Sequence, residues 1–344
     1  MKPLSPKTLE KMYAERGFSQ DTAALLHDYY LCFSNLYGVI SVGDAWDVFN
    51  KYEGTRPLRK EDFIAFSGIV QREAGHPYRV LELKEVYTGE TTEDPAERLI
   101  VNDRLIGVGY GKYTLLYNVV DQQQNKPYYL PAERTLFLAH VRDRFYLSPD
   151  GEKMVRYLGR LKTDGKYKDD HGKVRGDILD SDGNPVAGKC LSDFVCYTEH
   201  ERFSIDYAKS ETKKEQLRRE YGTTALDKIL NRIFTEIQTG GYLPDESTAN
   251  TLEYLIEFLD RDLGVEITPA RLERFSQLFM ELNNHSHLWL NRGWSPDELS
   301  RRSGFPQSAA VGPGLKKMLA EGTMDRAEFE RRMKALGIEV FYDK

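Results

Sequence analysis

The sequence has little cysteine, no long apolar run and no recognisable export signal. Its 344 residues include three cysteines, Cys32, Cys190 and Cys196, too few for the disulfide framework of a secreted protein. No apolar stretch approaches the roughly 20 residues that a membrane helix requires, and the N-terminus lacks the apolar segment of a secretory signal. We therefore expect a cytoplasmic protein that does not enter a membrane.

A strong net charge is also missing. The formal net charge is −6, from 48 Lys and Arg against 54 Asp and Glu, which excludes a globally basic nucleic-acid coat but leaves room for a local basic surface. With 40% hydrophobic and 30% charged residues, the chain is too apolar to be disordered and too long for one ordinary core. We expect a predominantly helical α+β protein of two or three domains.

The local signatures of common enzymes are absent. The glycine-rich string Gly107-Val-Gly-Tyr-Gly111-Lys112 resembles a phosphate-binding loop, but Ile106 and Tyr113 stand where that loop needs a glycine and a serine or threonine. No nucleophile elbow, HExxH pair or kinase signature occurs. The sequence therefore favours a non-catalytic protein without a cofactor.

Possible metal ligands are badly spaced. Cys190, Cys196 and His200 lack a tight Cys-x2-4-Cys knuckle and a fourth ligand. His285 and His287, two residues apart, would point in different directions on a helix. We therefore expect no metal at either place.

The N-terminal region, 1–103, has the element order of a winged helix. Periodicity and capping residues predict a helix over 22–37, a short strand at Val39-Ile40, a helix from Ser41, a helix over 59–72, and strands over 78–87 and 98–101. Residues 55–104 hold eight Lys and Arg against ten Asp and Glu, and the loop between the last strands carries Glu90, Glu93 and Asp94. Because these carboxylates would repel phosphate, we expect packing or protein contacts there, not duplex binding.

Two further regions follow. Residues 104–210 are predicted as a mixed α/β region with a turn-rich hairpin over 162–188, and 211–344 as a helical bundle with a C-terminal helix. Predicted helices span 132–142, 148–161, 226–237, 252–263, 268–282 and 325–336, with another beginning after Ser295. We find no internal repeat.

The middle region carries the densest positive charge. Residues 153–175 contain eight Lys and Arg against three Asp, with Tyr157 and Tyr167 between them, and 209–219 contain five against two. On one surface these residues could bind a nucleic-acid backbone while tyrosines stack on bases; the alternative is a solvated hairpin and helix face. The candidate nucleic-acid-binding residues are Lys153, Arg156, Arg160, Lys162, Lys166, Lys168, Lys173, Arg175, Lys213, Lys214, Arg218 and Arg219.

The most distinctive string is Asn283-Asn-His-Ser-His-Leu-Trp-Leu-Asn-Arg-Gly-Trp-Ser-Pro-Asp-Glu-Leu299. Its aromatic residues predict a turn between two helices that anchors on the bundle, with Gly293 allowing positive φ. The alternative is an interaction surface, because Trp and Arg are enriched at interface hot spots. The interface candidates are Trp289, Asn291, Arg292 and Trp294.

This string, the run Asn-Leu-Tyr-Gly-Val-Ile-Ser at 35–41 and Lys-Pro-Tyr-Tyr-Leu-Pro at 126–131 resemble segments of uncharacterised bacterial proteins. Those proteins often carry a SecA-C-terminus-like (SEC-C) zinc tail, which has no counterpart here because no cysteine follows Cys196. The resemblance implies an architecture and no particular activity.

We therefore predict a non-catalytic binding or regulatory protein that contacts a protein or a nucleic acid. The alternative is a nucleic-acid-processing enzyme or toxin-like effector, with some of Asp180, Asp182, Glu199 and His200 near the reaction. The string from Asp180 to Asn184 also resembles the start of a calcium loop, but Pro185 replaces the required glycine, so we predict a β-turn there.

Overall fold

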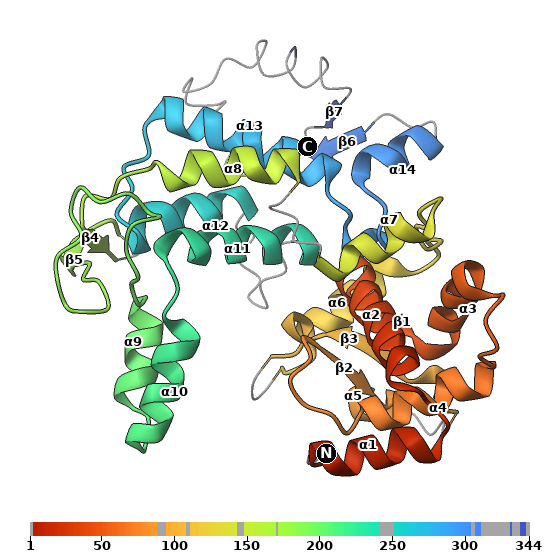
Figure 1. Cartoon of the computed structure of the whole chain (residues 1–344). Helices are drawn as coiled ribbons and strands as arrows, with labels where there is room; N and C mark the ends of the chain where they lie inside the picture. Colours follow the sequence, from red (N-terminus) through yellow and green to blue (C-terminus); the bar gives the residue numbers. More distant parts are fainter. Residues whose placement is uncertain are drawn as a thin grey trace. The chain divides into compact units, whose positions relative to one another are not determined.

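The structure is a computed structural model that describes residues 3–87, 94–107, 111–142, 148–169, 171–240, 251–303, 307–310, 331 and 338–341. It is mixed α+β, mostly helical with small sheets (Figure 1). The chain forms two compact units: one contains 1–144 and 287–295, the other 145–286 and 296–344. Residues 287–295 thus belong to the first unit, although the chain on either side of them belongs to the second.

No helix in the described ranges is long and apolar enough to cross a bilayer.

The first unit has a three-stranded antiparallel sheet among helices. Its elements run α1 (Pro6–Glu15), α2 (Gln20–Tyr37), β1 (Val39–Ser41), α3 (Val42–Glu53), α4 (Lys60–Val70), β2 (Tyr78–Leu81), α5 (Leu83–Val86), β3 (Leu99–Asn102), α6 (Thr114–Gln123) and α7 (Arg134–Ala139). Strand β3 lies between β1 and β2 and pairs with both. The predicted helices and strands between 22 and 102 are confirmed, except that the strand predicted over 78–87 ends at Leu81 because the helical turn α5 follows.

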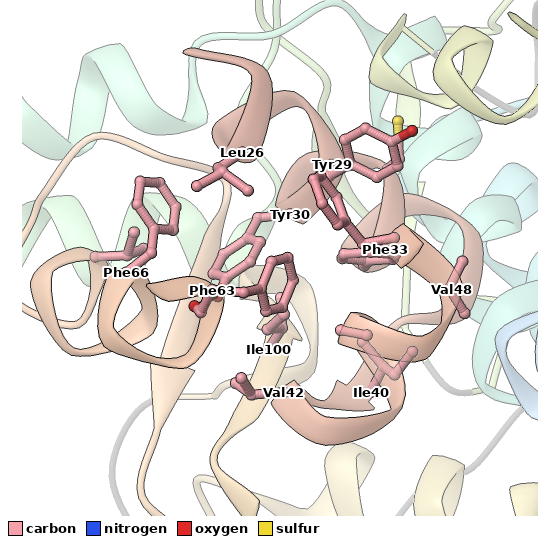
Figure 2. Packing of buried hydrophobic residues seen from close by; sticks show 14 of the residues in the cluster. Leu26, Tyr29, Tyr30, Phe33, Ile40, Val42, Val48, Phe63, Phe66 and Ile100 are labelled. Carbon is pink, nitrogen blue, oxygen red and sulfur yellow. Dashed lines mark hydrogen bonds between the residues drawn. The ribbon is translucent and has the colours of Figure 1, made fainter. Parts of the chain in front are cut away.

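Aromatic side chains fill the core of this unit. Tyr29, Tyr30 and Phe33 of α2 are fully buried, and the Tyr30 ring lies 5.5 Å from the ring of Phe63 on α4. Figure 2 shows these rings between the helices, with Ile100 of β3 among them. Because large rings bury much apolar area, this cluster stabilises the packing of α2 in the unit.

A buried carboxylate joins α3 to its neighbours. The Glu53 side chain is 5% exposed and accepts hydrogen bonds from the Tyr29 hydroxyl at 3.0 Å and from the guanidinium groups of Arg56 and Arg134. Burial by itself would raise the pKa of Glu53, but the hydrogen bonds from Arg134, Arg56 and Tyr29 outweigh it and the pKa is lowered. The stability from this cluster is therefore present above the ordinary pKa of 4.5 and is lost as pH falls through the lowered folded value.

Glu53→Gln tests this cluster. The variant keeps the shape but loses the charge that both arginines neutralise, so we expect it to lower the free energy of unfolding by about 2 kcal/mol at pH 7. The difference from wild type should shrink as pH falls through the lowered pKa of the folded carboxylate, where the wild-type side chain becomes protonated. Urea unfolding at pH 7 and pH 3 measures both values; a difference independent of pH would contradict the account.

Three sequence strings that lie far apart in the chain meet at the C-terminal end of α2. Gln123 of α6 donates from its amide to the carbonyl oxygens of Tyr37 (2.7 Å) and Trp289 (2.8 Å), and the Trp289 indole donates to the carbonyl of Asn35 (2.8 Å). Trp289 is 1% exposed. The string at 35–41 and Trp289 of the string at 283–299, both of which carry the family resemblance, are thus packed together inside the first unit.

The string at 126–131 completes this junction. The Lys126 ammonium donates to the carbonyl of Leu290 at 2.9 Å, and the Tyr129 amide donates to the carbonyl of Arg292 at 2.9 Å. Arg292 adopts φ +49° and places its guanidinium 4.4 Å from the ring centre of Tyr128. Its neighbour Gly293 has φ +83°, as the sequence predicts.

The four interface candidates therefore lie in an anchoring turn. Asn291 accepts a hydrogen bond from Lys126 (3.0 Å), and the Trp294 indole donates to the carbonyl of Pro127 (3.0 Å). The turn belongs to the first unit rather than to the helices that flank it in sequence, so the expected anchorage on the C-terminal bundle is wrong. The reason is that the Trp289 ring packs directly against Gly38, which has no side chain to occupy that space.

The second unit is mainly helical. Its elements are α8 (Pro149–Gly159), the hairpin β4 (Lys166–Lys168) and β5 (Val174–Asp177), α9 (Glu199–Asp206), α10 (Glu211–Tyr221), α11 (Ala225–Thr239), α12 (Thr251–Glu257), the π-helical turn η5 (Phe258–Asp262), α13 (Pro269–His285), α14 (Pro296–Ser303), and the parallel pair β6 (Gln307–Ala310) and β7 (Ile338–Phe341). The helices predicted at 148–161, 226–237 and 268–282 are confirmed, and α8 packs against α13 (Figure 1). The predicted helix over 325–336 lies outside the described residues apart from Arg331.

Candidate functional site

A cavity of about 330 Å³ lies in the second unit. Its walls come from the β4–β5 hairpin, the beginning of α9 and the π-helical turn η5. Such turns are frequent at functional sites, because they widen a helix locally and redirect its side chains. The basic and aromatic residues of the lining are Lys168, Arg175, Arg202, Arg261, His171, Tyr167 and Tyr197.

Glycines allow the hairpin to form one wall of this cavity. The amide of Asp164 donates to the carbonyl of Gly264 at 2.7 Å, and a Cβ on Gly264 would lie 2.5 Å from an oxygen of the Asp164 carboxylate. The ring of Tyr167 covers Gly176 on the partner strand, where a Cβ would lie 2.7 Å from the ring. The close approach of Asp164 thus ties the start of the hairpin to the chain that follows η5.

Several cavity charges are paired. Lys168, 18% exposed, lies 2.7 Å from Asp260, and Arg175 lies 2.6 Å from Asp169. Asp177, another lining residue, forms an ion pair with Lys166 of β4. Asp169 and Asp177 are therefore neutralised by neighbouring cations, so they repel an anionic ligand less than a count of acidic residues suggests.

Arg202 is held differently. Its Nε donates to the carbonyl of Tyr197 and its Nη2 to the carbonyl of Leu179, both at 3.1 Å. These acceptors are neutral, and they use two of the five N–H donors of the guanidinium. These two bonds fix the orientation of the Arg202 guanidinium at the cavity wall, and neither of them neutralises its charge.

The beginning of α9 is fixed by a capping box. The Thr198 hydroxyl accepts from the amide of Glu201 (3.4 Å), and the Glu201 carboxylate accepts from the amide of Thr198 (2.7 Å). Glu201 also binds the ammonium of Lys228 at 2.8 Å and 2.9 Å. Because Glu201 precedes Arg202, these bonds position the arginine through the backbone.

The structure brings two of the twelve basic candidates, Lys168 and Arg175, to this cavity. Six candidates form ion pairs: Lys153 with Asp150, Lys166 with Asp177, Lys168 with Asp260, Arg175 with Asp169, Lys214 with Glu211, and Arg219 with Glu215. The other six are exposed: Arg156, Arg160, Lys162, Lys173, Lys213 and Arg218. Counting charge along the sequence therefore overstated the charge that is free for a ligand.

Among the lining residues that the sequence analysis missed are Tyr197, Arg202, Arg261 and Asp262. The capping-box spacing of Thr198 and Glu201 was a usable signal for the beginning of α9. The π-helical turn that presents Arg261 and Asp262 has no comparable sequence signal, because it depends on tertiary packing.

Among the other residues that the sequence analysis singled out, those that the structure describes have structural roles. Asp180 accepts hydrogen bonds from the amides of Asp182 (3.1 Å) and Asn184 (2.8 Å), so the predicted β-turn is confirmed. Burial raises the pKa of the Cys196 thiol to about 11, which makes it a poor nucleophile at neutral pH. The side chains of Glu199 and His200 lie outside the described residues.

Comparison with protein-family models, curated proteins and solved structures gave no match. The short motifs that suggested a family therefore receive no support from these comparisons.

Proposed function

We propose that the chain is a non-catalytic cytoplasmic binding protein and that its second unit takes up single-stranded nucleic acid at the cavity. The observation that carries this proposal is the position of Arg202, held by two neutral carbonyls, in the lining that also contains Tyr167 and Tyr197. A guanidinium attracts a phosphate, and a tyrosine ring stacks on any base. The combination suits a flexible single strand whose bases can turn towards the protein.

A second feature of α9 supports the same function. Phe203 is 58% and Tyr207 73% exposed, and their rings stack with centroids 4.2 Å apart. Large aromatic rings exposed together are unfavourable in water and mark interaction surfaces. They stand on the helix that carries Arg202, so α9 offers both charge and stacking surfaces to a ligand.

For the first unit we propose a winged-helix module with a scaffold role. The order α2, β1, α3, α4, β2, β3 and the central position of β3 in its sheet support this assignment. The acidic balance of residues 55–104 argues against duplex DNA as its ligand. For the second unit we propose a helical bundle, on the packing of α8 against α13 and α11.

Fluorescence anisotropy with a labelled oligothymidylate about 12 nucleotides long tests the proposed function. Wild type should bind, and binding should weaken between about 50 mM and about 200 mM salt as counterion release predicts. Tyr167→Leu, which keeps apolar cover over Gly176, should weaken binding about tenfold through lost stacking.

Lys214→Ala on α10 is the matched control. Lys214 already pairs with Glu211 at 3.3 Å, so its removal should change the affinity less than twofold, within the small contribution of a surface pair. Equal affinities of wild type and Tyr167→Leu would contradict the proposed site. No binding at low salt would contradict the proposed function and leave a protein partner as the remaining class.

A further inference from the structure

Two histidines and a glutamate converge in the first unit, apart from any role proposed above. Nε2 of His27, on α2, lies 3.4 Å from Oε2 of Glu73, and Nε2 of His76 lies 3.1 Å from the same oxygen. Glu73 and His76 belong to the turn between α4 and β2. The three potential ligand atoms all lie within 4.8 Å of one another.

These separations suit a transition-metal ion. A tetrahedral Zn²⁺ with bonds of about 2.0–2.1 Å places its ligand atoms about 3.3 Å apart, and the two distances to Glu73 are close to that value. The rings of His27 and His76 stack with centroids 4.4 Å apart and an angle of 17°. Because stacked rings direct their lone pairs in parallel, the His76 ring must tilt to share an ion with His27.

His76 is the least enclosed of the three ligands, although its ring also stacks on the Tyr78 ring with centroids 5.2 Å apart. Its side chain is 35% exposed, and it follows Gly75, whose φ is +94° and whose Cβ position would meet nothing within 4 Å. His27 and Glu73 are more enclosed, with side-chain exposures of 21% and 9%. A fixed pair and an adjustable third ligand, open to solvent, leave space for water at the fourth position.

The outer partners of a metal site are already in place. The Tyr78 hydroxyl lies 2.7 Å from Nδ1 of His27, and the Tyr13 hydroxyl donates to Oε1 of Glu73 at 2.8 Å. In metal sites the second nitrogen of a ligating histidine normally donates to such a partner while the first nitrogen binds the ion. Nε2 of His27 also lies 3.2 Å from the Tyr13 hydroxyl, a contact that a bound ion would replace. The oxygen of Glu73 that faces the histidines is the one that Tyr13 does not bind.

We propose that His27, Glu73 and His76 form a binding site for a divalent transition-metal ion of the Zn²⁺ type, with water as the fourth ligand. The nitrogen-rich donor set favours such an ion over Mg²⁺ or Ca²⁺, which prefer oxygen. A bound ion would tie α2 to the turn after α4 and so stabilise the first unit. This site is independent of the cavity in the second unit and of the nucleic-acid proposal.

Isothermal titration of the chelator-treated full chain with Zn²⁺ tests the site. Wild type should bind one ion per chain, and His76→Gln, at the most exposed ligand, should weaken the binding about tenfold or more. Thermal unfolding should show a rise in Tm with Zn²⁺ for wild type that is lost in this variant. The variant's own unfolding transition without metal shows that it folds.

His171→Gln, at an exposed histidine of the second unit, is the control and should bind Zn²⁺ as wild type does. Titration with Mg²⁺ should show no saturable binding at the concentrations at which Zn²⁺ binds. Equal Zn²⁺ affinity of wild type and His76→Gln would overturn the proposal, as would the absence of saturable binding by wild type.

Discussion

Gly38→Ala should destabilise the first unit by about 3–5 kcal/mol, through backbone strain and overpacking together. Gly38 ends α2 with φ +72° and ψ −49°, a conformation that side-chain-bearing residues rarely adopt. A Cβ there would lie 2.6 Å from Cγ of Trp289. Because Trp289 is buried and its indole is bound to Asn35, the ring cannot move away without giving up that bond.

Gly17→Ala separates the two causes. Gly17 has a similar φ of +77°, but nothing lies within 4 Å of the position of its Cβ, so its substitution should show the backbone cost alone. Urea unfolding should give a smaller loss for Gly17→Ala than for Gly38→Ala. In a Trp289→Ala background, the cost of Gly38→Ala should fall to that smaller value; an unchanged cost would mean that the indole is not the obstacle.

Lys228→Met should have an effect of similar size in the second unit, about 3–5 kcal/mol. The Lys228 side chain is 6% exposed, and its ammonium binds the two carboxylate oxygens of Glu201 at 2.8 Å and 2.9 Å and the carbonyl of Tyr221 at 2.8 Å. Without the lysine, Glu201 keeps a poorly solvated charge and the carbonyl loses its donor. Removing one partner of such a pair is far more harmful than removing both.

The double variant Lys228→Met, Glu201→Gln should therefore recover part of the lost stability. Lys214→Met provides the comparison, because Lys214 pairs with Glu211, whose side chain is 75% exposed, and such a pair should contribute less than about 1 kcal/mol. Denaturant unfolding of the four proteins gives these values. Similar losses for Lys228→Met and Lys214→Met would show that burial of the first pair has no energetic consequence.

The sequence predicted the elements whose signals are local. The helices α2 and α13 follow from apolar periodicity, and Thr268 before Pro269 marks the beginning of α13 correctly, since its hydroxyl accepts from the amide of Arg271. The strand predicted over 78–87 was too long, because periodicity over so few residues does not distinguish a strand from the single turn of α5.

Long-range partners could not be predicted in the same way. The tryptophan string was assigned to the bundle because its neighbours in sequence are helices, whereas Trp289 is placed by Gly38 and Gln123, which lie far earlier in the chain. The proposed metal site could not be predicted for the same reason, because His27 is distant in sequence from Glu73 and His76. The positive charge of the hairpin can be read from the sequence, but the pairing of Lys168 with Asp260 depends on the position of η5.

Photocross-linking of the wild-type protein to an oligothymidylate, followed by mass spectrometry of the peptides, tests the central claim most directly. The account predicts that the cross-linked bases lie on peptides containing Tyr167 or Tyr197, and that unlabelled oligonucleotide competes for these positions. Cross-links confined to peptides outside the second unit, or scattered without competition, would contradict it.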